Sequence, residues 1–220
     1  MTSLSKIQLL FSGIILVILC AAKSHSFAAD AVSPGSIPNI LILGDSLSAA
    51  YGIPIAQSWP RLLATNIRLH YPDASVNNAS INGETTFGGA QRLPGLLERF
   101  EPNILIIELG GNDGLRGFKF SQTTDNLNSM VALALQNDIK VLLIGVDLPP
   151  NLGPVYNQQF QQIFTSVAHR HSIHYLPRFL QGIAADEPHL MQADGIHPTV
   201  MAQPILAEKV LAALSALLQD

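Results

Sequence analysis

The feature that most constrains the fold is a series of five short apolar runs separated by segments with helical spacing. Each run is four to six residues long, and Ile40–Leu43, Ile104–Leu109 and Val141–Val146 are rich in leucine and β-branched residues, which is typical of strands buried on both faces of a sheet. The runs are Ile40–Leu43, Val76–Ala79, Ile104–Leu109, Val141–Val146 and Ile173–Leu176.

The segments between these runs have the spacing of amphipathic helices. Two of them carry apolar residues at i, i+3 or i+4 and i+7 or i+8, which places those residues along one helix face. The first stripe is Leu127, Met130, Val131, Ala134 and Leu135, and the second is Val210, Leu211, Leu214, Leu217 and Leu218. Trp59 to Leu63 and Val155 to His169 are interpreted as two further helices. Strands that alternate with helices predict an α/β fold, a three-layer α/β/α domain with a parallel sheet.

Polar or glycine-rich segments follow the first four predicted strands. In a parallel sheet the carboxyl ends of the strands share one edge, and open α/β sheets bind ligands there. The segments are 45–48, 80–86, 110–114 and 147–154, and residues 194–198 precede the last helix. We therefore expect one cleft to which all five contribute.

Ser46 follows the first strand at this edge and is the candidate nucleophile. Serine attacks only when a base takes its proton, and the base needs a third group to fix its tautomer. His197 is the best candidate base, because Asp194 lies three residues earlier on a loop that contains Gly195. Simpler alternatives stay open: Asp45 and Ser46 can cap the next helix, and Asp194 can cap backbone amides of a turn.

Gly83 and Asn112 are candidate donors to a developing oxyanion. An attacked carbonyl gains negative charge and needs fixed hydrogen-bond donors nearby. Gly83 can bring a backbone N–H close, since it has no side chain, and Asn112 offers an amide that does not titrate. The alternative is that both are turn residues.

The sequence indicates no metal, nucleotide or nucleic-acid site. His169, His171 and His174 crowd a helix end without a carboxylate at convincing spacing, and residues 110–114 match no phosphate-binding fingerprint. We expect no metal, no cofactor and no nucleic-acid partner.

Residues 1–28 have the pattern of a secretory signal peptide: Lys6, an apolar run from Ile7 to Ala22, and small residues before Ala29. Without Lys6 and Lys23 the chain has 10 basic and 16 acidic residues, which argues against an anionic partner. Cys20 is the only cysteine, so the mature protein would have no thiol. We expect a periplasmic or secreted monomer without stable membrane insertion, in which 29–38 is a flexible lead-in and 39–220 is the catalytic domain.

Four sequence blocks appear in a fixed order, and together they resemble the SGNH (GDSL) hydrolase family. They are Gly44-Asp45-Ser46-Leu47-Ser48, Gly83 after Asn78-Ala79-Ser80, Gly110-Gly111-Asn112-Asp113, and Asp194-Gly195-Ile196-His197-Pro198. The sequence looks closest to the secreted bacterial thioesterase I, lysophospholipase and arylesterase branch, and the resemblance covers nearly the whole mature chain. It implies a flavodoxin-like domain with a five-stranded parallel sheet, in agreement with the five apolar runs.

The resemblance also implies the roles of the site residues. Ser46 would be the nucleophile, His197 the base and Asp194 its orienting partner. The oxyanion would be held by Ser46 N–H, Gly83 N–H and the Asn112 side chain. One departure is Ala50, where that branch usually has glycine.

The expected activity is hydrolysis of acyl esters or thioesters (arylesters, acyl-CoA or lysophospholipids) through a serine acyl-enzyme. We expect an acyl-binding surface formed by Leu148, Leu152 and Ile196, with Phe87, Leu115 and Phe118 nearby, because apolar residues at a site suit an apolar ligand. The alternatives are a carbohydrate O-deacetylase and a catalytically silent periplasmic binding module. The only tryptophan, Trp59, lies in a predicted helix, which weighs against a sugar site.

Overall fold

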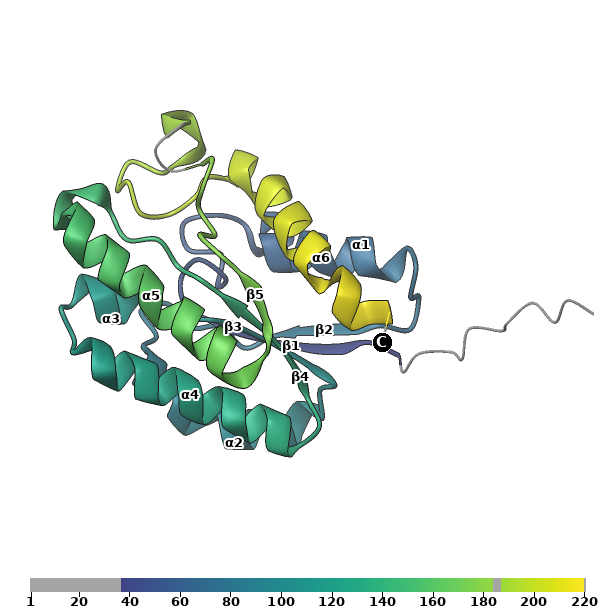
Figure 1. The fold of residues 1–220 in the computed structure, drawn as a ribbon. Helices are drawn as coiled ribbons and strands as arrows, with labels where there is room; N and C mark the ends of the chain where they lie inside the picture. Colours follow the sequence, from purple (N-terminus) through teal and green to yellow (C-terminus); the bar gives the residue numbers. More distant parts are fainter. Residues whose placement is uncertain (1–36, 184–186, 220) are drawn as a thin grey trace, which may run out of the picture. The chain divides into compact units, whose positions relative to one another are not determined.

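In the computed structural model, which describes residues 37–183 and 187–219, the described strands form one parallel sheet (Figure 1). They are β1 (Asn39–Gly44), β2 (Ser75–Asn78), β3 (Ile104–Glu108), β4 (Lys140–Ile144) and β5 (His174–Leu176). The order β2-β1-β3-β4-β5 is the flavodoxin-like arrangement, in which the order of adding strands to the sheet reverses between β1 and β3. The predicted signal peptide, residues 1–28, and most of the lead-in lie outside the described residues.

The central strands are the ones whose apolar runs are clearest in the sequence, because they are the most deeply buried. Ile40–Leu43 and Leu105–Ile107 are completely buried, because helices cover both faces of the sheet. The edge strands β2 and β5 are only half-buried, and β2 begins at Ser75 and ends at Asn78, one residue earlier at each end than predicted. The predicted fold class is confirmed.

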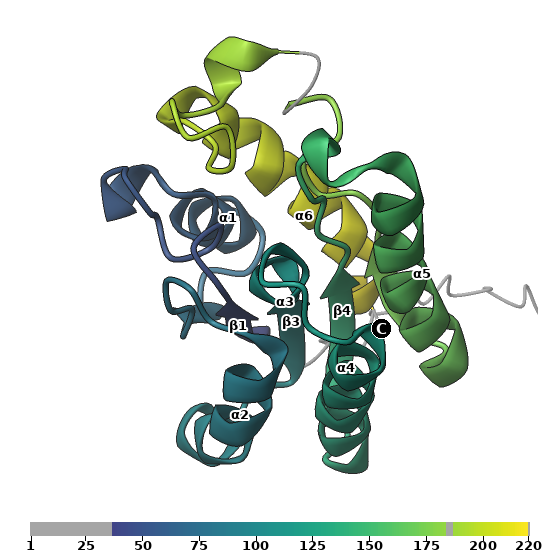
Figure 2. The same cartoon turned by 90° about the vertical axis from the view of Figure 1, so that its left-hand side faces the viewer.

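Helices cover both faces of the sheet, as Figure 2 shows. On one face lie α1 (Trp59–Arg68) and α6 (Gln203–Gln219), which pack against each other. On the other face α4 (Phe120–Gln136) lies between α2 (Thr86–Phe100) and α5 (Pro154–His171). A short helix, α3 (Gly111–Leu115), follows β3 directly.

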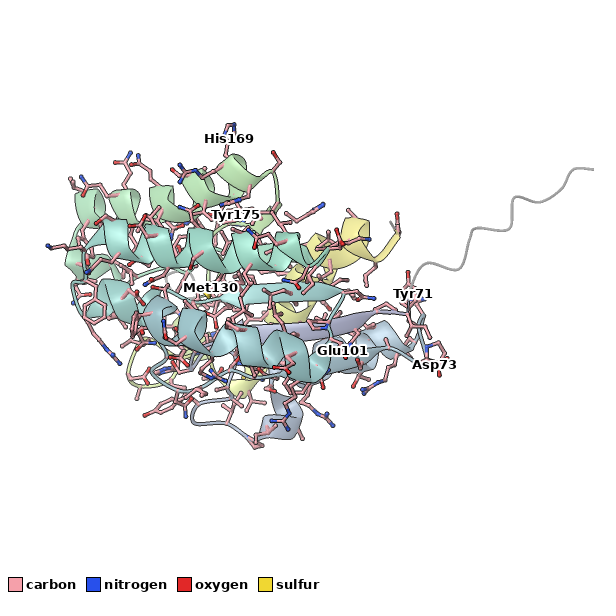
Figure 3. All side chains as sticks on the ribbon, turned by 90° about the horizontal axis from the view of Figure 1, so that it is seen from below. Tyr71, Asp73, Glu101, Met130, His169 and Tyr175 are labelled. Carbon is pink, nitrogen blue, oxygen red and sulfur yellow. The ribbon has the colours of Figure 1, made fainter. Side chains whose placement is uncertain are left out.

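The predicted stripe on α4 faces the sheet. Leu127, Met130, Val131 and Ala134 are buried, whereas Leu135, at the border of the stripe, is 40% exposed. Figure 3 shows Met130 in the interior and His169, on α5, pointing outward.

The C-terminal segment Val200–Gln219 is long and apolar enough to cross a membrane, with a mean hydropathy of 1.4. In the fold this segment forms part of the helical layer on one face of the sheet. Leu206, Val210 and Leu214 are fully buried, and α6 contacts α1, β4 and β5. The buried face of α6 is therefore part of the core.

Candidate active site

A cavity of about 630 Å³ opens at the carboxyl edge of the sheet, among the segments that the sequence predicted to converge there. Ser46 follows β1, Gly83 follows β2, Asn112 lies on α3 and Leu148 follows β4. His197 comes from the loop before η4 (Val200–Ala202). All five residues line the cavity, so segments that are far apart in the sequence meet at one place.

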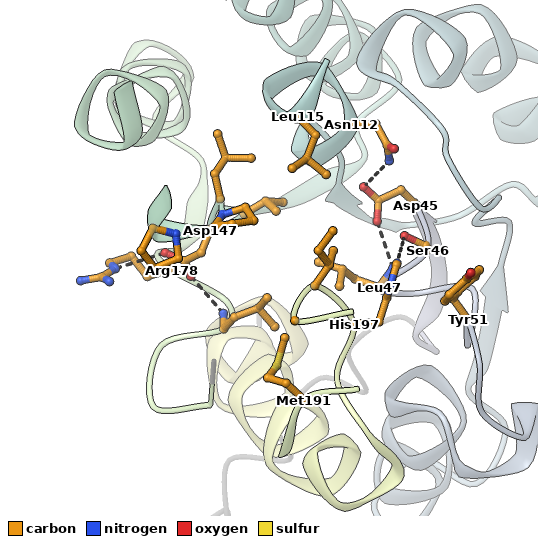
Figure 4. Close-up of a pocket in the computed structure, with 18 of the residues that line it drawn as sticks. Asp45, Ser46, Leu47, Tyr51, Asn112, Leu115, Asp147, Arg178, Met191 and His197 are labelled. Atoms are coloured by element: carbon orange, nitrogen blue, oxygen red, sulfur yellow. Dashed lines mark hydrogen bonds and ion pairs between the residues drawn. The ribbon is translucent and has the colours of Figure 1, made fainter. Parts of the chain in front are cut away.

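Ser46, His197 and Asp194 form a continuous hydrogen-bonded chain, and Figure 4 shows its Ser46 and His197 side chains. His197 Nε2 lies 2.8 Å from Ser46 Oγ, and His197 Nδ1 lies 2.7 Å from Asp194 Oδ2. Because an ionised carboxylate only accepts, Nδ1 carries the proton and Nε2 presents its lone pair to the serine. This is the arrangement that a serine nucleophile needs for activation.

Asp194 has two tasks, one for each oxygen. Oδ1 accepts backbone N–H bonds from Ile196, at 2.9 Å, and from His197, at 3.0 Å, whereas Oδ2 accepts from the imidazole. Desolvation opposes the ionisation of Asp194, but these hydrogen bonds outweigh it and lower its pKa to about 2. The turn-capping alternative is thus correct for one oxygen, and the catalytic interpretation fits the other.

The predicted oxyanion donors border the same cavity. Among the described residues, neither Ser46 N nor Gly83 N donates a hydrogen bond. Gly83 has a φ of 74°, which favours glycine, and its carbonyl accepts from Arg116 Nη2 at 3.0 Å. Asn112 Nδ2 donates to Asp45 Oδ2 at 3.1 Å, so one amide hydrogen is held and the other is left for a ligand.

Asp45 and Glu108 form a buried acidic pair beneath the site, which sequence reasoning did not identify. Glu108 Oε2 accepts from Ser48 Oγ at 2.7 Å and from Asp45 N at 3.3 Å. A Cβ at Gly44 would lie 2.9 Å from the same oxygen, so only glycine fits there. Burial raises the pKa of Asp45 to about 6, and burial together with the charge of Asp45 raises the pKa of Glu108 well above its usual value.

The apolar wall of the cavity differs from the expected one at Leu152. Leu148 and Ile196 line the cavity as expected, and so does Leu115. Leu152 is 38% exposed and is not among the described lining residues. It ends the 3₁₀ turn η2 (Pro150–Leu152), and residues two apart in such a turn point in different directions. Since Pro150 faces the cavity, Leu152 does not.

The remaining apolar lining was only partly expected. It includes Leu47, Val146, Pro149, Pro150, Leu180 and Met191. Phe87 and Phe118 are 62% and 42% exposed and are not among the described lining residues. At the end of the cavity away from Ser46, Asp147 pairs with Arg178 at 3.3 Å (Figure 4).

Two further residues near His197, Tyr51 and Gln192, are joined by a hydrogen bond and were not indicated by the sequence. The Tyr51 ring lies 4.2 Å from the His197 ring, centroid to centroid. The preceding Ala50 has a φ of 64°, a left-handed conformation that costs a non-glycine residue free energy. Ala50, which stands where the resembling branch usually has glycine, is therefore at a position where glycine would be less strained. No sequence pattern predicts the contacts of Tyr51 with His197 and Gln192, because they join loops about 140 residues apart.

No group of three potential metal ligands occurs in residues 37–183 and 187–219. His171 Nε2 lies 3.0 Å from Asn128 Oδ1, and His169 and His174 are exposed.

The comparisons with known proteins agree with this geometry. Residues 42–203 match the model of the GDSL-like lipase/acylhydrolase family. Esterase TesA of Pseudomonas aeruginosa is 45% identical over 179 residues, which cover 81% of this chain and 89% of that protein. The arylesterase of Vibrio mimicus is 41% identical, covering 84% and 91%. The thioesterase 1/protease 1/lysophospholipase L1 of Escherichia coli K12 is 41% identical, covering 77% and 79%.

Solved structures give the same result. The crystal structure of TesA superposes with a TM-score of 0.78 at 45% identity, over 81% of this chain and 98% of that chain. The psychrotrophic esterase EstA from Pseudoalteromonas sp., inhibited by monoethylphosphonate, superposes with a TM-score of 0.77 at 38% identity, over 82% and 98%.

Proposed function

Because this chain belongs to the GDSL-like lipase/acylhydrolase family and is a serine hydrolase of esters or thioesters, we propose that Ser46 is its nucleophile, His197 its general base and Asp194 the partner that orients His197. One observation carries the assignment: the hydrogen-bonded chain from Ser46 Oγ through both ring nitrogens of His197 to Asp194 Oδ2.

Acylation begins when His197 Nε2 takes the proton of Ser46 Oγ and the oxygen attacks the substrate carbonyl. Asp194, which stays ionised because its pKa is about 2, stabilises the imidazolium. The backbone N–H groups of Ser46 and Gly83 and the free amide hydrogen of Asn112 receive the oxyanion. His197 then gives its proton to the leaving oxygen or sulfur, and an ester on Ser46 remains.

Deacylation repeats these steps with water as the nucleophile. His197 takes a proton from the water, which attacks the acyl-enzyme carbonyl, and the proton returns to Ser46 Oγ as the acid departs. The same base therefore serves both half-reactions.

The apolar lining of the cavity supports medium-chain acyl groups as the acyl part of the substrate. Leu115, Leu148 and Ile196 face the same space as Ser46, and each buried methylene contributes up to about 0.8 kcal/mol. A sugar deacetylase is not favoured, since Trp59 is fully buried and hydrogen-bonded to Leu47 O in the core.

We also propose that the protein is exported to the periplasm or beyond, on the basis of the signal-peptide pattern in residues 1–28. N-terminal sequencing of the exported protein should begin at Ala29, and an intact Met1 on membrane-bound material would contradict cleavage.

Covalent trapping tests the nucleophile directly. The purified enzyme is treated with a p-nitrophenyl alkylphosphonate and digested, and the adduct is located by mass spectrometry. We expect one adduct on the peptide that contains Ser46, with loss of p-nitrophenyl ester hydrolysis. Ser46→Ala should abolish both labelling and turnover, whereas Ser129→Ala, on the exposed side of α4, should retain both. An adduct elsewhere would contradict the assignment.

A further inference from the structure

The nucleophile and the base lie on two separate loops. Ser46 belongs to the loop 45–53 that follows β1, and His197 to the loop 191–198 that precedes η4. Within the described residues, only two hydrogen bonds join these loops: the contact between Ser46 and His197 itself, and one made by Gln192.

Gln192 is bonded to both loops. Its side-chain Nε2 donates to Tyr51 O at 2.8 Å and to Pro198 O at 3.0 Å. Its backbone N donates to His197 O at 2.7 Å, and its backbone O accepts from Gly195 N at 2.9 Å. Gln192 thus binds the carbonyl groups of both His197 and Pro198 and connects them to the loop of Ser46.

The loop of Ser46 is shaped to receive this side chain. Gly52 has a φ of 72°, and a Cβ there would lie 2.3 Å from Gln192 Oε1. Only glycine allows so close an approach. The ring of Tyr51, whose carbonyl accepts this bond, lies against the imidazole of His197, with the ring planes inclined by 33°. Movement of Gln192 would therefore change both the backbone and the ring face that hold His197.

Catalysis depends on the distance that this contact controls. Proton transfer needs Ser46 Oγ and His197 Nε2 within hydrogen-bonding distance, and a misplacement of 1 Å can cost about 100-fold in rate. The imidazole is already oriented by Asp194, but Asp194 lies on the same loop as His197. It fixes the ring within its loop and does not fix the loop relative to Ser46.

We propose that Gln192 is a positioning residue that holds the base in register with the nucleophile. This inference rests on the proposed roles of Ser46 and His197. Since His197 acts in both half-reactions, Gln192 affects kcat for all substrates alike and leaves their binding unchanged.

Gln192→Met tests the proposal, because it keeps the length of the side chain and removes both donated bonds. We expect kcat for p-nitrophenyl butyrate to fall about 10- to 100-fold, with KM changed less than twofold and the order of preference among acyl chains retained. Gln192→Glu should be at least as slow near neutral pH, because a carboxylate cannot donate to the two carbonyls. Gln122→Met, a glutamine on the exposed side of α4, should behave as wild type.

A double-mutant cycle with His197→Ala separates positioning from general loss of structure. If Gln192 acts through His197, adding Gln192→Met to His197→Ala should leave the residual rate unchanged. An equal further loss in both backgrounds, or a change confined to KM, would overturn the proposal. The thermal midpoints of all variants are measured alongside, and a kcat loss that appears only near the melting temperature would also overturn it.

The same data distinguish this inference from the proposed function. If His197→Ala kept most of its turnover, the assignment of the base would be wrong. If His197→Ala were inactive while Gln192→Met was fully active, only the role of Gln192 would be wrong.

Discussion

Asn112 Nδ2 and Asp45 Oδ2 are joined by a hydrogen bond of 3.1 Å, which fixes the amide that faces the cavity. Asp45 is itself held by its second oxygen, which accepts from Leu47 N at 3.0 Å. The candidate oxyanion donor is therefore oriented by a buried carboxylate from the loop that carries Ser46.

Asn112→Ala should lower kcat by about 10²- to 10³-fold, the usual cost of removing one oxyanion donor, with KM nearly unchanged. Steady-state kinetics with p-nitrophenyl butyrate measures both. A change in KM alone would make Asn112 a substrate-binding residue.

Asp45→Asn should have a smaller effect on kcat, about tenfold, because an amide can replace only one of the two acceptors that Asp45 supplies. In an Asn112→Ala background the same substitution should cost no further activity, since the group it orients is missing. Additive losses would show that Asp45 acts independently of Asn112.

Ser46→Ala and His197→Ala should each remove most turnover, and the double variant should be no slower than either, because the two groups work as one unit. Asp194→Asn should cost less than either single variant. Circular dichroism checks that the variants remain folded, and a double variant much slower than both singles would contradict the coupling.

Acyl-chain preference offers a matched pair of leucines. Leu115 lines the cavity and is 40% exposed, whereas Leu152 is 38% exposed and lies off the cavity. For the wild type we expect kcat/KM to rise from acetyl to medium-chain p-nitrophenyl esters. Leu115→Ser should flatten that rise, and Leu152→Ser should preserve it. A wild-type maximum at acetyl would contradict the apolar acyl site.

Glu108→Gln should change how stability depends on pH. Glu108 is fully buried and its pKa is raised, mainly by desolvation, so the folded state retains the proton more tightly than the unfolded chain. The protonated Glu108 therefore contributes to the free energy of unfolding. This contribution is fully present below the pKa that Glu108 has in the unfolded chain, near 4.5, and is lost as the pH rises toward its pKa in the folded state.

In Glu108→Gln this titration is absent, so the free energy of unfolding should fall less between pH 5 and pH 8 than in the wild type. The difference should be about 1.4 kcal/mol for each unit by which the pKa of Glu108 is raised within that range. Urea unfolding at the two pH values measures it, with the exposed Glu98→Gln as control. An unchanged pH dependence would show that Glu108 does not titrate differently in the two states.

The sequence by itself determined the architecture and the four blocks that meet at the cavity. Strands such as β3 are buried on both faces, so nearly all of their residues are apolar (Ile104–Ile107 in β3), and the helices between them show their own period. Ser46, Gly83, Asn112 and the Asp194–His197 pair could be identified because each lies in a short local motif after a strand or before a helix, and a parallel sheet brings those positions to one edge. The predicted bounds of edge strand β2 differed by one residue at each end, because a half-buried strand has a less continuous apolar run.

Only the tertiary structure decided which residues hold these groups in place. Gln192 meets Tyr51 across 141 positions, and Glu108 meets Ser48 across 60; neither contact leaves a local pattern, since any donor and acceptor that the fold brings together would serve. The same holds for the cavity wall: Leu148 and Leu152 look equivalent in the sequence, but Leu148 lines the cavity, whereas Leu152, at the end of the 3₁₀ turn η2, does not. Periodicity and motifs report local conformation, whereas contacts between distant loops depend on the path of the whole chain.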